Sequence, residues 1–203
     1  MSRKVPIAFL PGVGASADFW KPAAQAMRRG CRHTFHSWPG LGDEPPSPPV
    51  NGPADLVKLV ADGIREPTDV VAQSMGGVIA IQLALERPDL VRKLVLATTS
   101  GGISMAEHGA EDWRTSYRSE YPDAPSWLYS DWGDQTDRLP SISAPVLLIW
   151  GDRDSISPVS VGKRLQCLIP GAVLKVISGG AHDLARSHAS KVAGLIETFL
   201  ADE

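Results

Sequence analysis

The stretch Ala72-Gln73-Ser74-Met75-Gly76 decides how this chain is interpreted, because a predicted strand precedes it and a predicted helix follows it. The β-branched run Thr68-Asp69-Val70-Val71 predicts the strand, and residues 77–85 predict a helix whose first turn carries small residues. A serine in such a turn, with small residues two before and two after it, has the layout of a nucleophile elbow. That turn lifts the serine Oγ above the sheet. The alternative is a serine in an ordinary strand-to-helix turn.

Two further reactive residue types follow predicted strands later in the chain. The apolar run 144–150 ends in Gly151-Asp152-Arg153-Asp154, and the strand predicted over 172–177 leads to His182. A serine nucleophile needs a base, and the base needs an orienting acid. Ligands of parallel sheets bind outside the carboxyl ends of the strands, where all three side chains are expected. The order serine, acid, histidine therefore predicts a hydrolytic site, with both Asp152 and Asp154 available as the acid.

The chain resembles the α/β-hydrolase family over nearly all of its length. The segments that carry the resemblance are Leu10-Pro11-Gly12-Val13-Gly14, Ala72-Gln73-Ser74-Met75-Gly76-Gly77, Gly151-Asp152-Arg153-Asp154 and Gly179-Gly180-Ala181-His182-Asp183. They are similar to small carboxylesterase- and lactonase-like members with a short cap. The resemblance implies Ser74 as nucleophile, His182 as base and Asp154 as the acid, because the family's acid sits three residues past the glycine. The other histidines, His33, His36, His108 and His188, have no comparable setting.

The same resemblance implies an oxyanion hole built from two backbone N–H groups, those of Val13 and Met75. The sequence departs from the family pattern in two places. Ala72 stands where glycine is usual, and a Cβ there is costly if φ is positive. Leu10-Pro11 stands where the family usually has a histidine, so the sequence does not show what braces the oxyanion loop.

The alternation of strands and helices predicts one α/β-hydrolase domain over residues 1–203, with about six mostly parallel strands and helices on both faces. The strands are expected near 5–10, 33–38, 68–73, 92–98, 144–150 and 172–178. The helices are expected near 18–29, 53–65, 75–86, 158–168 and 186–201, with Asp18 and Ser157-Pro158 as helix starts.

Residues 101–140 interrupt the alternation and are too long for a plain strand-to-helix connection. The family places its cap here, so a short cap over the active site is expected. Its aromatic residues could form the cap's own core or face the substrate, and Trp113, Trp127 and Trp132 are the candidates for the second role. Few charges are expected in a compact apolar pocket of this kind. The proline-rich loop 38–53 could be a wall of the pocket, a surface loop or a PxxP ligand for another protein.

A net charge of −3 and a pI near 5.9 give no electrostatic argument for binding nucleic acid or an anionic membrane. The apolar run after the basic N-terminus is too short for a signal peptide, and no stretch approaches the roughly 20 apolar residues of a membrane span. We expect a cytoplasmic serine hydrolase for a small carboxylic ester, thioester or lactone, without metal or organic cofactor. A carbon–carbon bond hydrolase, lyase or cofactor-free oxygenase, and a ligand-binding pseudoenzyme, are the alternatives, because fold does not fix function. The sequence leaves the oligomeric state open.

Overall fold

The computed structural model describes residues 4–46 and 50–201. Its centre is a six-stranded sheet in the order β2-β1-β3-β4-β5-β6, in which every paired strand is parallel. The strands are β1 (Ile7–Leu10), β2 (His33–Phe35), β3 (Thr68–Gln73), β4 (Val91–Ala97), β5 (Val146–Gly151) and β6 (Val173–Ile177). The predicted six-stranded parallel sheet is therefore confirmed, although β2 is shorter than the stretch 33–38 that was expected to form it.

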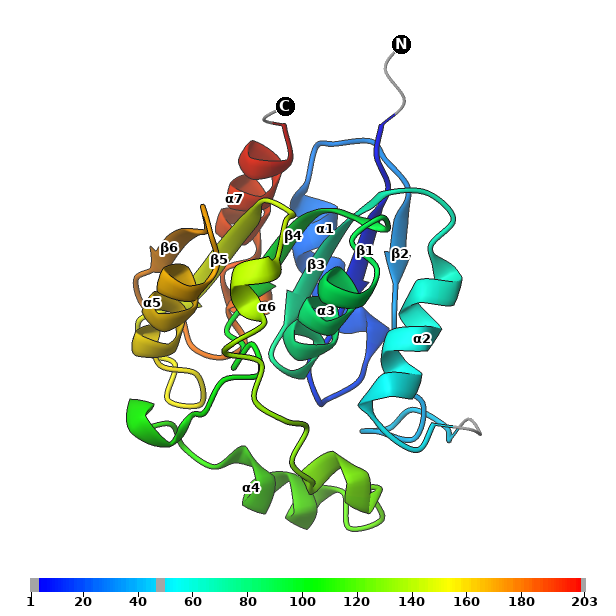
Figure 1. Ribbon diagram of the computed structural model, residues 1–203, viewed down its shortest axis with the longest axis vertical. Helices are drawn as coiled ribbons and strands as arrows, with labels where there is room; N and C mark the ends of the chain where they lie inside the picture. The colour runs from blue at the N-terminus through cyan, green and yellow to red at the C-terminus, as the bar shows by residue number, and fades with distance from the viewer. Residues whose placement is uncertain (1–3, 47–49, 202–203) are drawn as a thin grey trace.

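Helices cover both faces of the sheet and bury two apolar layers (Figure 1). The helices are α1 (Lys21–Ala26), α2 (Pro53–Gly63), α3 (Met75–Glu86), α5 (Val159–Leu168), α6 (Leu184–Ser187) and α7 (Ala189–Ala201). Figure 1 shows α2, α3 and α5 in front of the sheet and α1 and α7 behind it. The inner strands β3 and β5 are buried along their whole length, since both of their faces are covered by helices.

Several helix boundaries differ from the sequence prediction, among them the ends of α1 at Ala26 and α2 at Gly63. The first helix starts as the 3-10 turn η1 (Ala17–Trp20), and the side chain of Ser16, not Asp18, caps it by accepting from the Asp18 N–H. Pro158 occupies the N-cap position, one residue before α5, and is not the first residue of the helix. The last predicted helix is divided at His188 into α6 and α7. The predicted starts at Asp18 and Pro158 lie within two residues of the observed positions, a difference that is common at helix ends.

The segment 101–140 lies beyond the carboxyl ends of the strands, where Figure 1 shows α4 below the sheet. It contains η2 (Ala106–His108), α4 (Trp113–Glu120), η3 (Ser126–Tyr129) and η4 (Leu139–Ser141). Its aromatic rings pack on one another: Tyr117 and Tyr121 have ring centroids 4.8 Å apart, and Trp127 and Trp132 have centroids 5.9 Å apart. We call this segment the cap.

The proline-rich loop packs against the loop that follows β1. Trp38 is fully buried and donates from Nε1 to the carbonyl oxygen of Pro11 at 2.9 Å. The Gly40 N–H donates to the Pro45 carbonyl at 3.1 Å, and Pro48 and Pro49 lie outside the described residues.

Within residues 4–46 and 50–201, no helix is long and apolar enough to span a membrane.

Candidate active site

Ser74 is the single residue between β3 and α3, and its backbone is strained. Its φ of 51° and ψ of −122° lie outside the regions that non-glycine residues normally adopt. Three hydrogen bonds hold it there: its N–H donates to Ala97 at 3.0 Å, and its carbonyl accepts from the Gly77 N–H at 2.9 Å and from Thr99 Oγ1 at 2.6 Å. Surrounding contacts therefore fix a conformation that the serine would not adopt alone.

The positions of the two small residues beside this turn differ in whether they tolerate a Cβ. Ala72 lies within β3, paired with Leu10 and Leu96 and with no positive φ, so its Cβ carries no backbone penalty. Gly76 has no such freedom, because a Cβ there would collide with the carbonyl oxygens of Pro11 and Leu10. The first turn of α3 thus packs directly on the β1–η1 loop, which brings Ser74 against that loop.

Ser74, His182 and Asp154 form one hydrogen-bonded row. The distance from Ser74 Oγ to His182 Nε2 is 3.0 Å, and that from His182 Nδ1 to Asp154 Oδ2 is 2.8 Å. Asp154 is 5 % exposed, and its other oxygen accepts from the N–H groups of Ile156 at 2.9 Å and Ser157 at 2.8 Å. Both carboxylate oxygens are therefore occupied, which fixes the carboxylate against the imidazole.

Asp152 has a different position. It is exposed, and its Oδ1 accepts from the Gly179 N–H at 2.7 Å, which ties the loop after β5 to the loop after β6. The two loops also approach through glycines, since a Cβ at Gly151 would overlap the backbone of Gly180. Of the two aspartates, the structure brings only Asp154 to the imidazole.

Two side chains that the sequence motifs did not indicate hold the backbone carbonyl of His182. Gln73 Nε2 donates to the His182 carbonyl at 3.2 Å, and Thr98 Oγ1 lies 3.4 Å from the same oxygen. Thr98 is itself strained, with a φ of 42°. The available signal was the polar run Thr98-Thr99-Ser100 at the end of a buried strand, a position where polar side chains often serve a site.

Tyr117, from the cap, hydrogen-bonds to the loop that carries Val13. Its hydroxyl donates to the Val13 carbonyl at 3.2 Å and accepts from the Gly42 N–H at 2.8 Å. Burial raises the pKa of the Tyr117 phenol, so the hydroxyl keeps the proton that it donates. Trp20 and Trp38 hold the start of the same loop through its Leu10 and Pro11 carbonyls, both at 2.9 Å. Tyrosine and tryptophan donors thus brace a loop that has no histidine at this place.

A model of the alpha/beta hydrolase family matches residues 7–130, which is more than half of the chain. The chain belongs to this family. It is 29% identical over 206 residues to a pimeloyl-[acyl-carrier protein] methyl ester esterase of Neisseria meningitidis, an alignment that covers 80% of each chain. A solved hydrolase of Pseudomonas aeruginosa superposes with a TM-score of 0.78 at 22% identity, over 100% of this chain and 92% of that one. A thermophilic esterase of Thermogutta terrifontis gives a TM-score of 0.78 at 20% identity, over 97% and 89%.

This member of the alpha/beta hydrolase family has a cavity of about 450 Å³ between the cap and the strand ends, and Ser74 and His182 line it. Val13 and Met75, the expected oxyanion donors, line it too. Its apolar wall is formed by side chains from the body and the cap, including Val78, Ile103, Met105, Trp113, Leu128, Trp132 and Ile156. Trp127 is not among the lining residues. It lies against Trp132, whose Nε1 donates to the Trp127 carbonyl at 3.1 Å.

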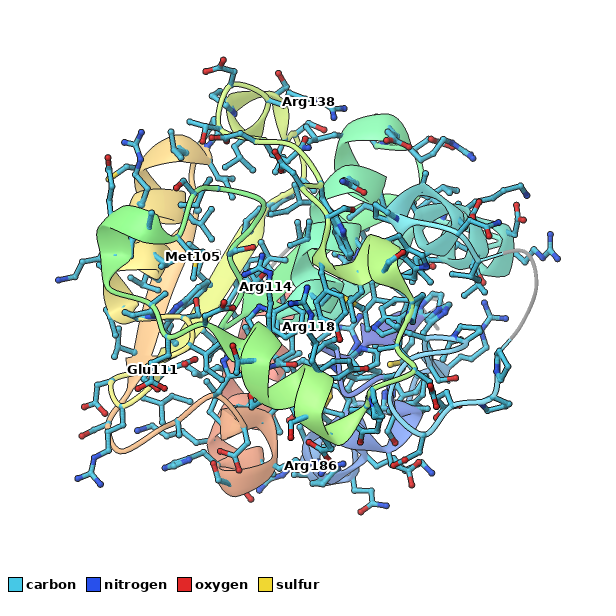
Figure 2. All side chains as sticks on the ribbon, turned by 90° about the horizontal axis from the view of Figure 1, so that it is seen from below. Met105, Glu111, Arg114, Arg118, Arg138 and Arg186 are labelled. Carbon is cyan, nitrogen blue, oxygen red and sulfur yellow. The ribbon has the colours of Figure 1, made fainter. Side chains whose placement is uncertain are left out.

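The expectation of few charges in this pocket is wrong. Glu111, Asp112, Arg114 and Asp131 all line the cavity, and all four are exposed at its rim. Figure 2 looks onto the cap and shows Met105 and Glu111 beside α4, with Arg114 close to it. The cause is that the cap's apolar side chains face inward, so the polar half of this short segment borders the opening. The described part of the proline-rich loop does not line the cavity.

Among the described residues, no group of three or more His, Cys, Asp or Glu side chains is arranged to hold a metal ion. The polar groups next to Ser74 are instead committed to one another by the hydrogen bonds above. This arrangement can transfer a proton from Ser74 Oγ to His182 Nε2, while Asp154 faces Nδ1 of the same imidazole ring.

Proposed function

We propose that the protein is a serine hydrolase that cleaves a small carboxylic ester, thioester or lactone through an acyl-enzyme on Ser74. The observation that carries the proposal is the row Ser74 Oγ–His182 Nε2 at 3.0 Å and His182 Nδ1–Asp154 Oδ2 at 2.8 Å. In this mechanism Ser74 Oγ attacks the carbonyl carbon while His182 takes its proton. His182 then gives that proton to the leaving oxygen or sulfur, and Asp154 stabilises the imidazolium.

The negative oxygen of the tetrahedral intermediate needs two donors, and we assign them to the N–H groups of Met75 and Val13. Met75 is the first residue of α3, where backbone N–H groups lack helical partners and the helix dipole favours negative charge. Val13 lies in the loop braced by Tyr117. Losing one such donor costs other enzymes about 3–4 kcal/mol, so the position of each matters as much as most side chains.

Hydrolysis of an ester is supported by the similarity to the meningococcal protein, whose name gives it a methyl ester as substrate. Water completes the reaction: it attacks the acyl carbon, His182 accepts its proton, and the bond to Ser74 Oγ breaks with return of a proton to the serine. The apolar wall of the cavity favours a hydrocarbon acyl group, while the charged side chains at the rim would contact the part of the substrate that extends out of the opening.

A fluorophosphonate probe and a panel of p-nitrophenyl esters test the proposal together. We expect the probe to label the wild-type protein on Ser74 and to leave Ser74→Ala unlabelled, with ester turnover lost in the same variant. Thermal unfolding of both proteins serves as the control for folding. Labelling without turnover on any ester would favour a carbon–carbon bond hydrolase or a binding protein, and absence of labelling would refute an activated Ser74.

A further inference from the structure

A second cavity, of about 260 Å³, also opens beside Ser74. It lies between the β1–η1 loop with Phe19 and the segment that follows His182, including Asp183 and Arg186. Among the described residues, Val13, Ser74 and His182 are the ones that line both cavities. These three are the proposed oxyanion donor, nucleophile and base, so the reacting carbon of a bound ester would lie where the two cavities meet.

An ester or thioester has two arms on its carbonyl carbon, and this junction offers a separate space for each. We propose that the second cavity binds the alcohol or thiol arm and that Arg186 selects arms that carry a negative charge. This inference rests on the proposed function, because it takes Ser74 as the nucleophile.

The two cavities differ in ways that assign the arms. The first is larger, and its apolar side chains provide enough surface to bury a hydrocarbon acyl chain. The second is smaller and lies between two loops, and Gly14, Asp183 and Arg186 at its edge are exposed. Such a site suits the arm that must leave into water before a water molecule can attack the acyl-enzyme.

Arg186 brings a cation to this second cavity. Its guanidinium lies 5.4 Å from the centre of the Phe19 ring, and both side chains line the cavity. Among the described residues, no carboxylate lies within ion-pair distance of Arg186. The other charge on this wall is Asp183, whose Oδ1 accepts from Ser187 Oγ at 3.2 Å. Figure 2 shows Arg186 across α4 from Met105, which lines the first cavity.

The chemistry of the leaving step follows from this placement. The bond from Ser74 Oγ to the acyl carbon forms, the bond from that carbon to the alcohol oxygen or thiol sulfur breaks, and the serine proton reaches the leaving atom through His182. The alcohol or thiol then departs through the second cavity. The acyl group stays in the first until water releases it.

The charge preference is tested with two butanoate esters of matched shape, the 4-carboxybenzyl and the 4-carbamoylbenzyl ester. We expect wild-type kcat/KM to favour the carboxylate by about two- to fivefold, the size of one ion pair at a solvent-open site. Arg186→Gln should abolish this preference and Arg186→Lys should keep most of it. Arg114→Gln, at the first cavity, is the matched control and should leave the preference unchanged. No preference in the wild type, or one that survives Arg186→Gln, would overturn the role of Arg186.

The assignment of arms is tested by filling the second cavity. Gly14 lines it, has no positive φ and has open space where a Cβ would stand, so Gly14→Leu can project into the cavity. We expect kcat/KM to fall by about tenfold for benzyl butanoate and by less than about twofold for methyl butanoate, as overfilling predicts. Gly14→Ala is the matched control. Loss confined to long acyl chains, or equal loss on every ester, would overturn the assignment. If fluorophosphonate failed to label wild-type Ser74, the proposed function itself would fail, which is a separate result.

Discussion

Replacing Tyr117 by phenylalanine removes one oxygen atom from the point where the cap meets the loop that carries Val13. That hydroxyl accepts from the Gly42 N–H at 2.8 Å and donates to the Val13 carbonyl at 3.2 Å. The ring is buried and packs on Tyr121, so Tyr117→Phe keeps its packing and loses only the two hydrogen bonds. If the Val13 N–H is an oxyanion donor, a looser Val13 should weaken binding of the transition state more than binding of the substrate.

The structure sets the size of the effect. Each lost hydrogen bond is worth about 1 kcal/mol net, so the free energy of unfolding should fall by about 2 kcal/mol. The donor itself is displaced and not deleted, so the catalytic loss should stay below the 3–4 kcal/mol of a missing donor. We therefore expect kcat to fall by about ten- to thirtyfold, with KM changed by less than about twofold.

The assay is steady-state hydrolysis of p-nitrophenyl butanoate, together with inhibition by a trifluoromethyl ketone that mimics the tetrahedral intermediate. Inhibitor affinity should fall in parallel with kcat/KM, which a merely loosened fold would not require. Tyr121→Phe is the matched control, because it removes a hydroxyl from the neighbouring ring of the cap. A kcat within twofold of wild type would refute the reasoning, and a raised KM with unchanged kcat would assign Tyr117 to substrate binding instead.

The remaining predictions concern the hydrogen-bonded row and one buried histidine. Ser74→Ala should leave only the rate that the oxyanion hole and binding provide, about 10³–10⁴ above water, which single-turnover assays at high enzyme concentration can measure. Asp154→Asn should lower kcat by about 10⁴, as in the serine-protease case, and Asp152→Asn by far less; the reverse result in the same ester assay would mean that the acid is wrongly assigned. Burial lowers the pKa of His36 from 6.5 to about 4. The unfolded chain therefore takes up this proton first, so stability is lost as pH falls from about 6.5 to about 4, by about 3 kcal/mol. Urea unfolding at pH 7 and pH 4.5 should show a smaller acid loss in His36→Phe, which can keep the stacking on Trp38.

Much of the fold could be predicted because its signals are local. The strands are apolar or β-branched runs, and buried parallel strands show as such runs in the sequence. The turn at Ser74 could be predicted from the small residue at position 76, because backbone carbonyls crowd Gly76 and leave no room for a larger side chain. The positions of Asp154 and His182 follow from the same logic, because parallel strands deliver their carboxyl ends to one edge.

The bracing of the site could not be predicted, because it depends on contacts between distant parts of the chain. Tyr117 and Val13 are far apart in sequence, and no spacing or periodicity joins them. The charged rim was missed for another reason: the short cap contains enough Trp and Tyr to suggest an apolar pocket, but composition does not show which face of a segment borders the opening. Glu111 and Arg114 reach the rim only through the conformation of the cap.

The strained residues show which constraints on the candidate site come from the body of the protein and which come from the cap. The non-glycine residues with positive φ among those described are Ala15, Ser74 and Thr98, and all three follow strands that end beneath the cap. Such conformations cost about 1–3 kcal/mol each and persist only where surrounding contacts hold them. Ser74 and Thr98 are held by the body of the protein, through Ala97, Thr99, Gln73 and the loop of His182. The loop that contains Ala15 is held in part by Tyr117, so we expect a protein without its cap to keep Ser74 and His182 in place while losing a constraint on Val13.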